Sequence, residues 1–185
     1  MSDFELQPAK PKPNQRTVAG PHRATARTDT WLTPPYILKA LGEFDLDPCA
    51  APEPRPWPTA SRHITLPTNG LQIEWHGRVW LNPPYGRATG TWLEKLANHG
   101  NGIALIFART DTDMFFEQVW KRADAVAFLR GRLTFCDAAG RIASFNAGGP
   151  SCLVAYGLSC ALLLRYAAID LGAHFVTLQN QSLSS

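Results

Sequence analysis

Hydrophobic positions along the chain alternate between strand-like and helix-like patterns. The near-continuous apolar run Gly102–Ala108 is typical of a strand buried on both faces of a sheet, and Cys152–Tyr156 predicts another strand. Apolar residues three and four positions apart predict helices over Thr89–Asn98 and Ser159–Leu171. Shorter strands are predicted at Phe44–Asp47, His63–Leu66, Arg78–Leu81, Ala123–Leu129 and His174–Leu178. The alternation favours an α/β fold with an open sheet that has some antiparallel edge.

Caps and turn residues set further boundaries. Thr33 is predicted to cap a helix that carries Pro34 and Pro35 in its first turn and ends at Gly42. Asp111 is predicted to cap a later helix. The buried face of that helix is predicted to consist of Phe115, Phe116, Val119 and Trp120. Segments Arg132–Cys136 and Arg141–Phe145 flank turn-forming residues and predict an antiparallel hairpin.

Prolines mark the parts of the chain outside the regular elements. Residues 1–28 hold four prolines and no sustained hydrophobic period, which predicts a disordered basic tail. Five prolines between residues 48 and 58 forbid a helix there and predict a stiff extended loop. One domain is therefore expected over residues 29–178, followed by a disordered tail at residues 179–185.

Composition and charge limit the classes of function. The chain has 185 residues, of which 45% are hydrophobic and 18% charged, as in ordinary globular proteins. Apolar segments are too short to span a membrane and the first thirty residues lack a signal-peptide core, so a cytoplasmic location is expected. Residues 1–27 hold five basic and two acidic side chains, which accounts for the net charge of +3; charge alone does not identify the partner. The cysteine and histidine spacings predict no metal site and no disulfide framework.

The sharpest chemical signal is the segment Asn82-Pro83-Pro84-Tyr85-Gly86 at the end of a predicted buried strand. Open α/β sheets bind ligands at the carboxyl ends of their strands. Consecutive prolines stiffen the chain and remove two N–H donors. The amide oxygen of Asn82 and the carbonyl oxygen of Pro83 are therefore suited to accept both hydrogens of one amino group and localise its lone pair for attack. Tyr85 offers a flat face for stacking a flipped base, while a rigid surface turn is the alternative interpretation.

The setting of this segment resembles the amino-methylating DNA methyltransferases that use S-adenosylmethionine. More narrowly, it resembles the small phage-type DNA adenine-N6 methyltransferases (Dam-like) over roughly residues 29–178. The segments that carry the resemblance are Asp29-Thr30-Trp31-Leu32-Thr33-Pro34, Phe44-Asp45-Leu46-Asp47-Pro48-Cys49-Ala50, Asn69-Gly70-Leu71 with Trp75, Val79-Trp80-Leu81-Asn82-Pro83-Pro84-Tyr85-Gly86, Arg109-Thr110-Asp111-Thr112 and Gly131-Arg132-Leu133-Thr134-Phe135.

The resemblance implies a fold and an activity. The fold would be a compact Rossmann-like α/β methyltransferase sheet, mixed and mostly parallel, with an antiparallel hairpin and reduced helices. The activity would be site-specific transfer of a methyl group from S-adenosylmethionine to the N6 amine of adenine in double-stranded DNA. Its implied catalytic residues are Asn82, Pro83, Pro84 and Tyr85. A phage or prophage origin, with the protein in a bacterial host cell, would fit protection of viral DNA from host restriction.

A cofactor site is also implied by the resemblance, formed by Thr33, Pro34, Asp47, Pro48, Cys49, Ala50, Asn69 and Leu71. Asp47 would pair with the α-ammonium of the cofactor, or would be a solvated turn carboxylate. Thr33 would bond the cofactor carboxylate near a helix N-terminus, or would serve only as a cap. Asn69 would bond the cofactor adenine, or would fill a left-handed turn position.

Candidate DNA contacts are Arg87, Arg130, Arg132 and Asn146. Arg130 and Arg132 suit phosphate contact, although hairpin arginines are usually just exposed. Asn146 and the Gly148-Gly149-Pro150 turn are candidates for the wall of a target-base pocket. For Arg109 and Asp111, a structural ion pair is favoured over ordering of the active-site rim and over a contact with DNA.

Two departures from the wider methyltransferase pattern keep other interpretations open. The Gly-rich turn usual after the first strand is replaced by Cys49-Ala50-Ala51-Pro52, so the helix that normally cradles the cofactor is expected to be absent or displaced. No acidic residue ends the second strand, which leaves the ribose hydroxyls without an assigned partner. The alternatives are a methyltransferase acting on cytosine N4, RNA adenine or protein glutamine, and a catalytically inert DNA-binding relative. Asn rather than Ser at the start of the loop favours adenine over cytosine by resemblance.

Overall fold

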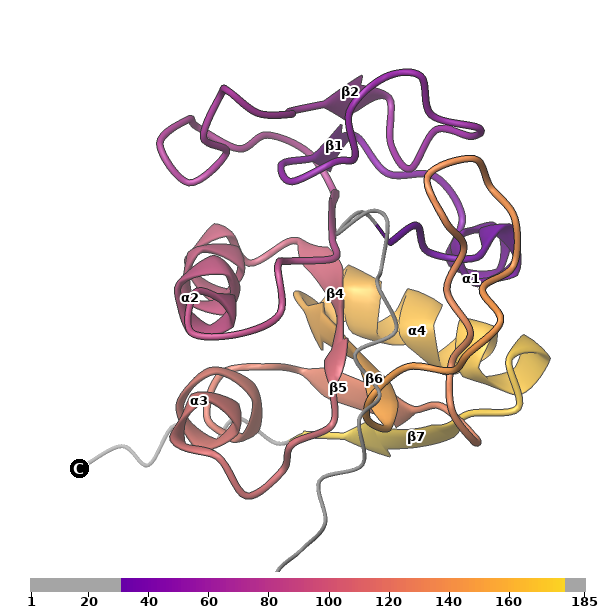
Figure 1. Cartoon of the computed structure of the whole chain (residues 1–185). Coiled ribbons are helices and arrows are strands. Elements are labelled where there is room, and N and C mark those ends of the chain that lie inside the picture. The colour runs from indigo at the N-terminus through magenta and orange to yellow at the C-terminus, as the bar shows by residue number, and fades with distance from the viewer. Residues whose placement is uncertain (1–30, 179–185) are drawn as a thin grey trace, which may run out of the picture.

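The computed structural model describes residues 31–178, which form one mixed sheet flanked by helices (Figure 1). The predicted tails, residues 1–28 and 179–185, lie outside the described residues. The strands are β1 (Leu46–Asp47), β2 (Arg62–His63), β3 (Val79–Leu81), β4 (Gly102–Phe107), β5 (Ala125–Phe128), β6 (Ser151–Tyr156) and β7 (His174–Thr177), in the spatial order β2-β1-β3-β4-β6-β5-β7. The helices are α1 (Pro35–Leu41), α2 (Thr89–His99), α3 (Asp113–Phe115), the π-helical segment η1 (Phe116–Trp120) and α4 (Leu158–Asp170).

Strand direction divides the sheet into two parts. β2, β1, β3 and β4 pair in parallel, whereas β6 runs antiparallel between β4 and β5, and β7 pairs antiparallel with β5. Within residues 31–178, three strand pairings are parallel and three are antiparallel, so the sheet is mixed as predicted but parallel pairing is less dominant. The physical reason is that β6 separates β4 from β5, although these two run in the same direction. The carboxyl ends of β1, β3, β4 and β5 share one edge of the sheet.

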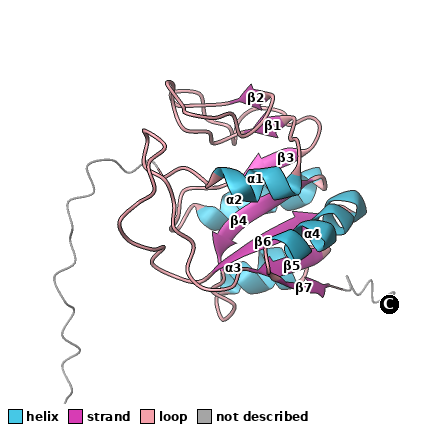
Figure 2. Ribbon diagram, turned by 90° about the vertical axis from the view of Figure 1, so that its right-hand side faces the viewer, coloured by secondary structure: helices cyan, strands magenta, loops and turns pink. Residues whose placement is uncertain are grey.

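Helices cover both faces of this sheet (Figure 2). On the α1 and α4 face, the core includes Trp80, Leu105 and Leu153. On the α2 and α3 face, it includes Leu81 and Ile106. Because successive strand residues point to opposite faces, the residue that follows Leu81 is directed to the α1 face. Among the described residues, no helix is long and apolar enough to cross a membrane.

The predicted cap of the first helix is wrong. α1 begins at Pro35, and Pro34 occupies the cap position without a side-chain hydrogen bond. Thr33 lies before the helix and is 2% exposed. Its hydroxyl accepts a hydrogen bond from the side-chain amide of Asn82 instead (3.4 Å). A partner from a distant strand therefore replaces the local capping bond that the sequence suggests.

The cap predicted for the later helix is also displaced by one residue. The hydroxyl of Thr112, not the carboxyl of Asp111, accepts the N–H of Phe115 at the start of α3. Phe115 is fully buried as predicted, whereas Phe116 is half exposed. The difference follows from the π-helical backbone of η1, which changes the face that each residue presents.

The predicted hairpin, residues 132–145, is present as an irregular loop rather than as two strands. Its turn closes at Asp137, whose main-chain N–H donates to the carbonyl of Arg141. Cys136 forms isolated bridges with Ile142 within the hairpin and with Leu32 outside it. Two main-chain hydrogen bonds join Cys136 to Leu32, at 2.9 and 3.0 Å. The hairpin is therefore attached to the segment that precedes α1, beside the carboxyl edge of the sheet.

Candidate active site

The segment that begins at Asn82 lies at the carboxyl edge of the sheet, directly after the fully buried strand β3. The amide nitrogen of Asn82 donates to Thr33, which fixes one side of the amide group. The amide oxygen Oδ1 is buried and has no hydrogen-bond partner among residues 31–178. A buried acceptor without a partner carries a free-energy cost of about 1–3 kcal/mol, so a donor from beyond residues 31–178 would stabilise this atom.

α2 holds the loop that follows Asn82 in place. The hydroxyl of Thr89 donates to the carbonyl of Pro84 (2.9 Å) and accepts the N–H of Gly86 (3.1 Å). Gly86 has a φ of 130°, a backbone conformation that L side chains rarely adopt. The Pro84 carbonyl thus has a partner on α2. No hydrogen bond within the described part of the chain uses the carbonyl of Pro83.

Beside this loop lies an aromatic pocket. The ring of Tyr85 stacks on Phe107 with 4.1 Å between ring centroids and 16° between planes, and it meets Phe135 edge-on at 6.3 Å. Tyr85 keeps 38% of its surface exposed, and burial against its neighbours raises the pKa of its phenol, which stays protonated at neutral pH. The pocket has a volume of about 150 Å³ and is lined by Trp31, Tyr85, Phe107, Phe135, Ala143, Phe145, Asn146, Ala147 and Gly148. A space of this size accepts an aromatic ring.

The hairpin supplies the outer wall of the pocket. Trp31 and Phe145 meet edge to face with their centroids 5.3 Å apart. The amide oxygen of Asn146 accepts a hydrogen bond from the hydroxyl of Thr134 (2.7 Å), and Arg132 donates to the carbonyl of Ala147 (3.2 Å). Asn146 thus lines the pocket at the place that the sequence suggested for a target-base wall.

The cofactor residues predicted after β1 surround one buried carboxylate. Asp47 is 4% exposed, which excludes the solvated turn carboxylate. Its carboxyl oxygens accept hydrogen bonds from the N–H of Cys49 (3.1 Å) and from the hydroxyl of Thr59. Burial raises the pKa of Asp47 to about 6, against the effect of these two hydrogen bonds and of the nearby Arg55.

Two contacts join the predicted cofactor segments to one another and to the Asn82–Gly86 loop. The thiol of Cys49, whose pKa is raised by burial and by Asp47, donates to the main-chain carbonyl of Asn82 (3.3 Å). A Cβ at Gly70 would overlap the carbonyl of Pro48, so only glycine allows the 69–71 loop to approach the end of β1 this closely. The segments around residues 33, 48, 70 and 82 are therefore assembled at one edge of the sheet.

A family model described as DNA N-6-adenine-methyltransferase (Dam) matches residues 20–156 of the chain. The chain belongs to this family. Membership in the Dam family implies a DNA adenine methyltransferase, which is a transferase. No curated protein and no solved structure matches the chain. The match spans every element from α1 to β6, and so includes the Asn82–Gly86 loop, the buried carboxylate and the aromatic pocket.

In this Dam-family protein, the backbone of Asn69 does not adopt the left-handed conformation that the sequence suggested as one alternative. None of the described residues other than glycine has a positive φ. The Asn69 side chain instead accepts the N–H of Leu71 (3.0 Å), which closes a local side-chain turn. Lys95 of α2 donates to the carbonyl of Leu71 (2.7 Å) and stabilises the same loop. The Asn69 side chain is exposed, and its proposed bond to cofactor adenine stays a prediction.

The candidate DNA-binding arginines Arg87, Arg130 and Arg132 are all exposed. Arg87 follows the Asn82–Gly86 loop, while Arg130 and Arg132 lie at the start of the hairpin. The predicted ion pair between Arg109 and Asp111 is absent from the ion pairs of residues 31–178. Arg109 lies over the ring of Phe107 instead, 5.7 Å from its centroid, at the side of the pocket.

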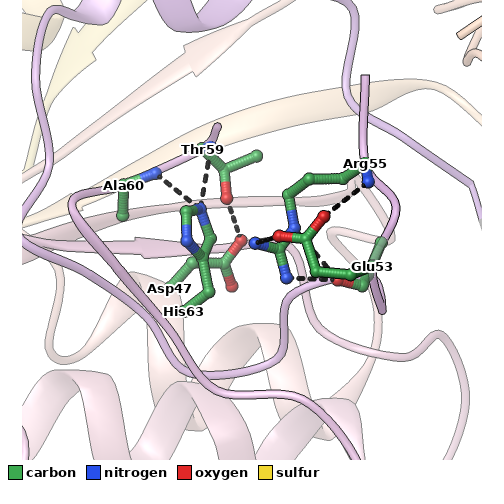
Figure 3. Close-up of polar contacts among 7 residues, drawn as sticks. Asp47, Glu53, Arg55, Thr59, Ala60 and His63 are labelled. Carbon is green, nitrogen blue, oxygen red and sulfur yellow. Dashed lines mark hydrogen bonds and ion pairs between the residues drawn. The ribbon is translucent and has the colours of Figure 1, made fainter. Parts of the chain in front are cut away.

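Three residues in and after the proline-rich loop were not predicted from the sequence: Arg55, Thr59 and His63. Arg55 donates to the carbonyl of Ala51 and to the carboxyl of Glu53, which organises the loop where the Gly-rich turn is missing (Figure 3). Thr59 reaches Asp47, and His63 accepts main-chain N–H groups from the same segment. As expected from the missing Gly-rich turn, no helix lies between β1 and β2. The signal available in the sequence was a loop too rich in proline to satisfy its polar groups with regular structure.

Proposed function

We propose that the protein transfers a methyl group from S-adenosylmethionine to the N6 amine of an adenine that is flipped out of double-stranded DNA. Family membership supports the reaction class, and the buried, unpartnered Oδ1 of Asn82 is the observation that carries the mechanism. An exocyclic amine that donates to this oxygen would satisfy a buried acceptor for which residues 31–178 provide no donor.

Asn82 and Pro83 would activate the amine by accepting its two hydrogens. The lone pair of an aromatic amine is delocalised into the ring, and two acceptors that hold the hydrogens out of plane localise it on nitrogen. The Pro83 carbonyl suits this role because no residue of the described chain competes for it, whereas the Pro84 carbonyl is occupied by Thr89. The stiffness of the double proline keeps both acceptors in place, so that catalysis rests on positioning and hydrogen bonding.

The aromatic pocket would receive the flipped base. Tyr85 is supported from behind by Phe107, which leaves its exposed surface available for stacking. Unstacking a base costs a few kcal/mol, and stacking on an aromatic platform recovers about 1–3 kcal/mol per base. Asn146 at the rim is a candidate to contact the edge of the base, and Arg87, Arg130 and Arg132 are candidates for phosphate contact.

The residues at the carboxyl edge fit S-adenosylmethionine. A buried carboxylate at the end of β1 suits the α-ammonium of the ligand, and Thr33 suits its carboxylate. Pro34, Pro48, Cys49, Ala50, Asn69 and Leu71 would complete the site, within one Rossmann-like domain over residues 29–178. When bound, the cofactor supplies a methyl group on a sulfonium, which is open to in-line displacement. The narrow sequence resemblance further suggests a phage or prophage enzyme of the bacterial cytoplasm that protects viral DNA from restriction.

The test is product analysis. Purified protein is incubated with unmethylated duplex DNA and S-adenosylmethionine, and the digested nucleosides are measured by mass spectrometry. N6-methyladenine is expected. N4-methylcytosine, or product only on RNA, would assign the other amine substrates, and binding of DNA without any methylated product would assign an inert relative.

A further inference from the structure

Asp47 is held from two sides, and one of these contacts comes from outside the cofactor segments identified above. Cys49 donates its main-chain N–H to Oδ1, which is a local contact two residues away. Thr59 donates its hydroxyl to Oδ2 across twelve residues of sequence. The proline-rich loop lies between these two residues, so the Thr59 contact closes that loop onto the end of β1 (Figure 3).

The Thr59 hydroxyl is itself fixed by the backbone around it. The ring nitrogen Nε2 of His63 accepts the main-chain N–H groups of Thr59 (3.1 Å) and Ala60 (3.2 Å). A nitrogen that accepts two N–H groups carries no proton, so this ring is neutral with its proton on Nδ1. His63 pairs in register with Asp47 across β1 and β2. The sheet therefore sets the position of His63, and His63 sets the position of Thr59.

The carboxylate keeps acceptor capacity beyond these two contacts. An ionised carboxyl group has about four lone-pair sites, and the two hydrogen bonds use one on each oxygen. With both oxygens oriented by neutral donors, the group is ready for a charged donor such as an ammonium.

We propose that Thr59 is a positioning residue that orients the Asp47 carboxylate toward the α-ammonium of S-adenosylmethionine. This inference rests on the proposed function, since it assumes that the ligand binds at the end of β1. In this proposal, Thr59 at the end of the proline-rich loop orients the ligand-binding carboxylate in a chain that lacks the Gly-rich turn.

The experiment measures binding by calorimetry with two ligands. S-adenosylhomocysteine carries the α-ammonium, whereas 5′-methylthioadenosine keeps the adenosine and the sulfur but lacks the amino-acid part. Thr59→Val is expected to weaken S-adenosylhomocysteine binding at least about tenfold and to leave methylthioadenosine binding within about twofold. Thr59→Ser keeps the hydroxyl and is expected to bind both ligands like the wild type. Ser61→Ala removes a neighbouring exposed hydroxyl and serves as the matched control.

A double-mutant cycle provides the second measurement. If Thr59 acts through Asp47, Thr59→Val is expected to have no further effect on S-adenosylhomocysteine affinity in an Asp47→Asn background. Equal weakening of both ligands by Thr59→Val, or additive effects in the cycle, would overturn the positioning role and leave Thr59 as a loop-closing residue. Failure of the wild type to bind either ligand would instead remove the proposed cofactor itself, which separates the two failures.

Discussion

The half-buried side chain of Asn82 combines a hydrogen-bonded nitrogen with a buried oxygen that has no partner among the described residues. Such an arrangement is unfavourable for the folded chain alone and becomes favourable when a donor arrives. We expect Asn82→Ala to lower the rate of DNA methylation at least about a hundredfold, as loss of a preorganised transition-state contact does. We expect little change in the melting temperature, because the substitution also removes the unpartnered acceptor. Rates and thermal unfolding are measured for this variant and for Lys121→Ala, a control at the exposed residue that follows η1. A methylation rate of Asn82→Ala within threefold of the control rate would contradict the assignment.

Asp47 makes stability depend on pH in an uncommon direction. Its pKa is about 6 in the folded protein against an ordinary value of 3.8, so the folded state holds its proton more tightly than the unfolded state. This contribution is complete below about pH 4 and is lost as the pH rises through about 6, a change of about 3 kcal/mol. Asp47→Asn is expected to remove it. Chemical unfolding between pH 4 and 7 should show the wild type losing stability relative to the variant.

The groups that act on this carboxyl define the control for the pH experiment. Arg55, Cys49 and Thr59 each favour its charged form, and all three remain in the Asn variant. The pKa of His63 is lowered by burial and by Arg55, so His63 contributes with the opposite sign in an overlapping pH range. Because His63 titrates in both proteins, the difference between wild type and Asp47→Asn isolates Asp47. A difference that does not change with pH would contradict the burial argument.

At the scale of elements, the contact between the hairpin and the proline-rich loop can be tested with a matched pair of glycines. Gly140 has a φ of +81°, and a Cβ there would lie 2.8 Å from the ring of Trp57. Gly131 has a similar φ of +75° and no atom within 4 Å of such a Cβ. Gly131→Ala should cost about 1 kcal/mol through its backbone conformation alone. Gly140→Ala is expected to destabilise more, by the added cost of displacing the ring, as measured by urea unfolding; equal losses would show that the hairpin tip is not packed.

The elements also show which structural information the sequence contained. β4, α2 and β6 were predicted to within one or two residues because their hydrophobic periods are determined by burial, which acts along the whole element. The Thr33 cap failed because its hydroxyl is used by Asn82, 49 residues away. The hairpin was predicted as two strands, yet Cys136 pairs with Leu32 as well as with Ile142. Local patterns do not encode such long-range partners.

The same distinction between local patterns and long-range contacts applies to the residues of the candidate site. The loop from Asn82 to Tyr85 was predictable because its chemistry is contiguous and follows a recognisable buried strand. Arg55 and Thr59 were not predictable, because threonine and arginine in a loop are normally solvated and nothing local identifies Asp47 as their neighbour. A buried carboxylate needs hydrogen-bond partners, but its burial becomes evident only in the folded chain.

At the scale of the whole molecule, the described part is close to neutral, so a few exposed arginines are the candidates for the proposed DNA contacts. Arg130 and Arg132 stand together at the start of the hairpin, beside the aromatic pocket. We expect each Arg→Ala substitution to weaken DNA binding similarly for all sequences and to reduce the salt slope of log K by about one. Binding is followed by fluorescence anisotropy over a series of salt concentrations. Lys39→Ala on α1 is the control, and an unchanged salt slope in the arginine variants would place the DNA elsewhere.

The thiol that bonds the carbonyl of Asn82 has a consequence for how the protein tolerates oxidants. Electrophiles and peroxides attack the thiolate form of cysteine. Cys49 is kept in its protonated form by burial and by the adjacent carboxyl group. Alkylating reagents should therefore modify it slowly at neutral pH, and the hydrogen bond that joins the end of β1 to the segment after β3 should persist under mild oxidative stress.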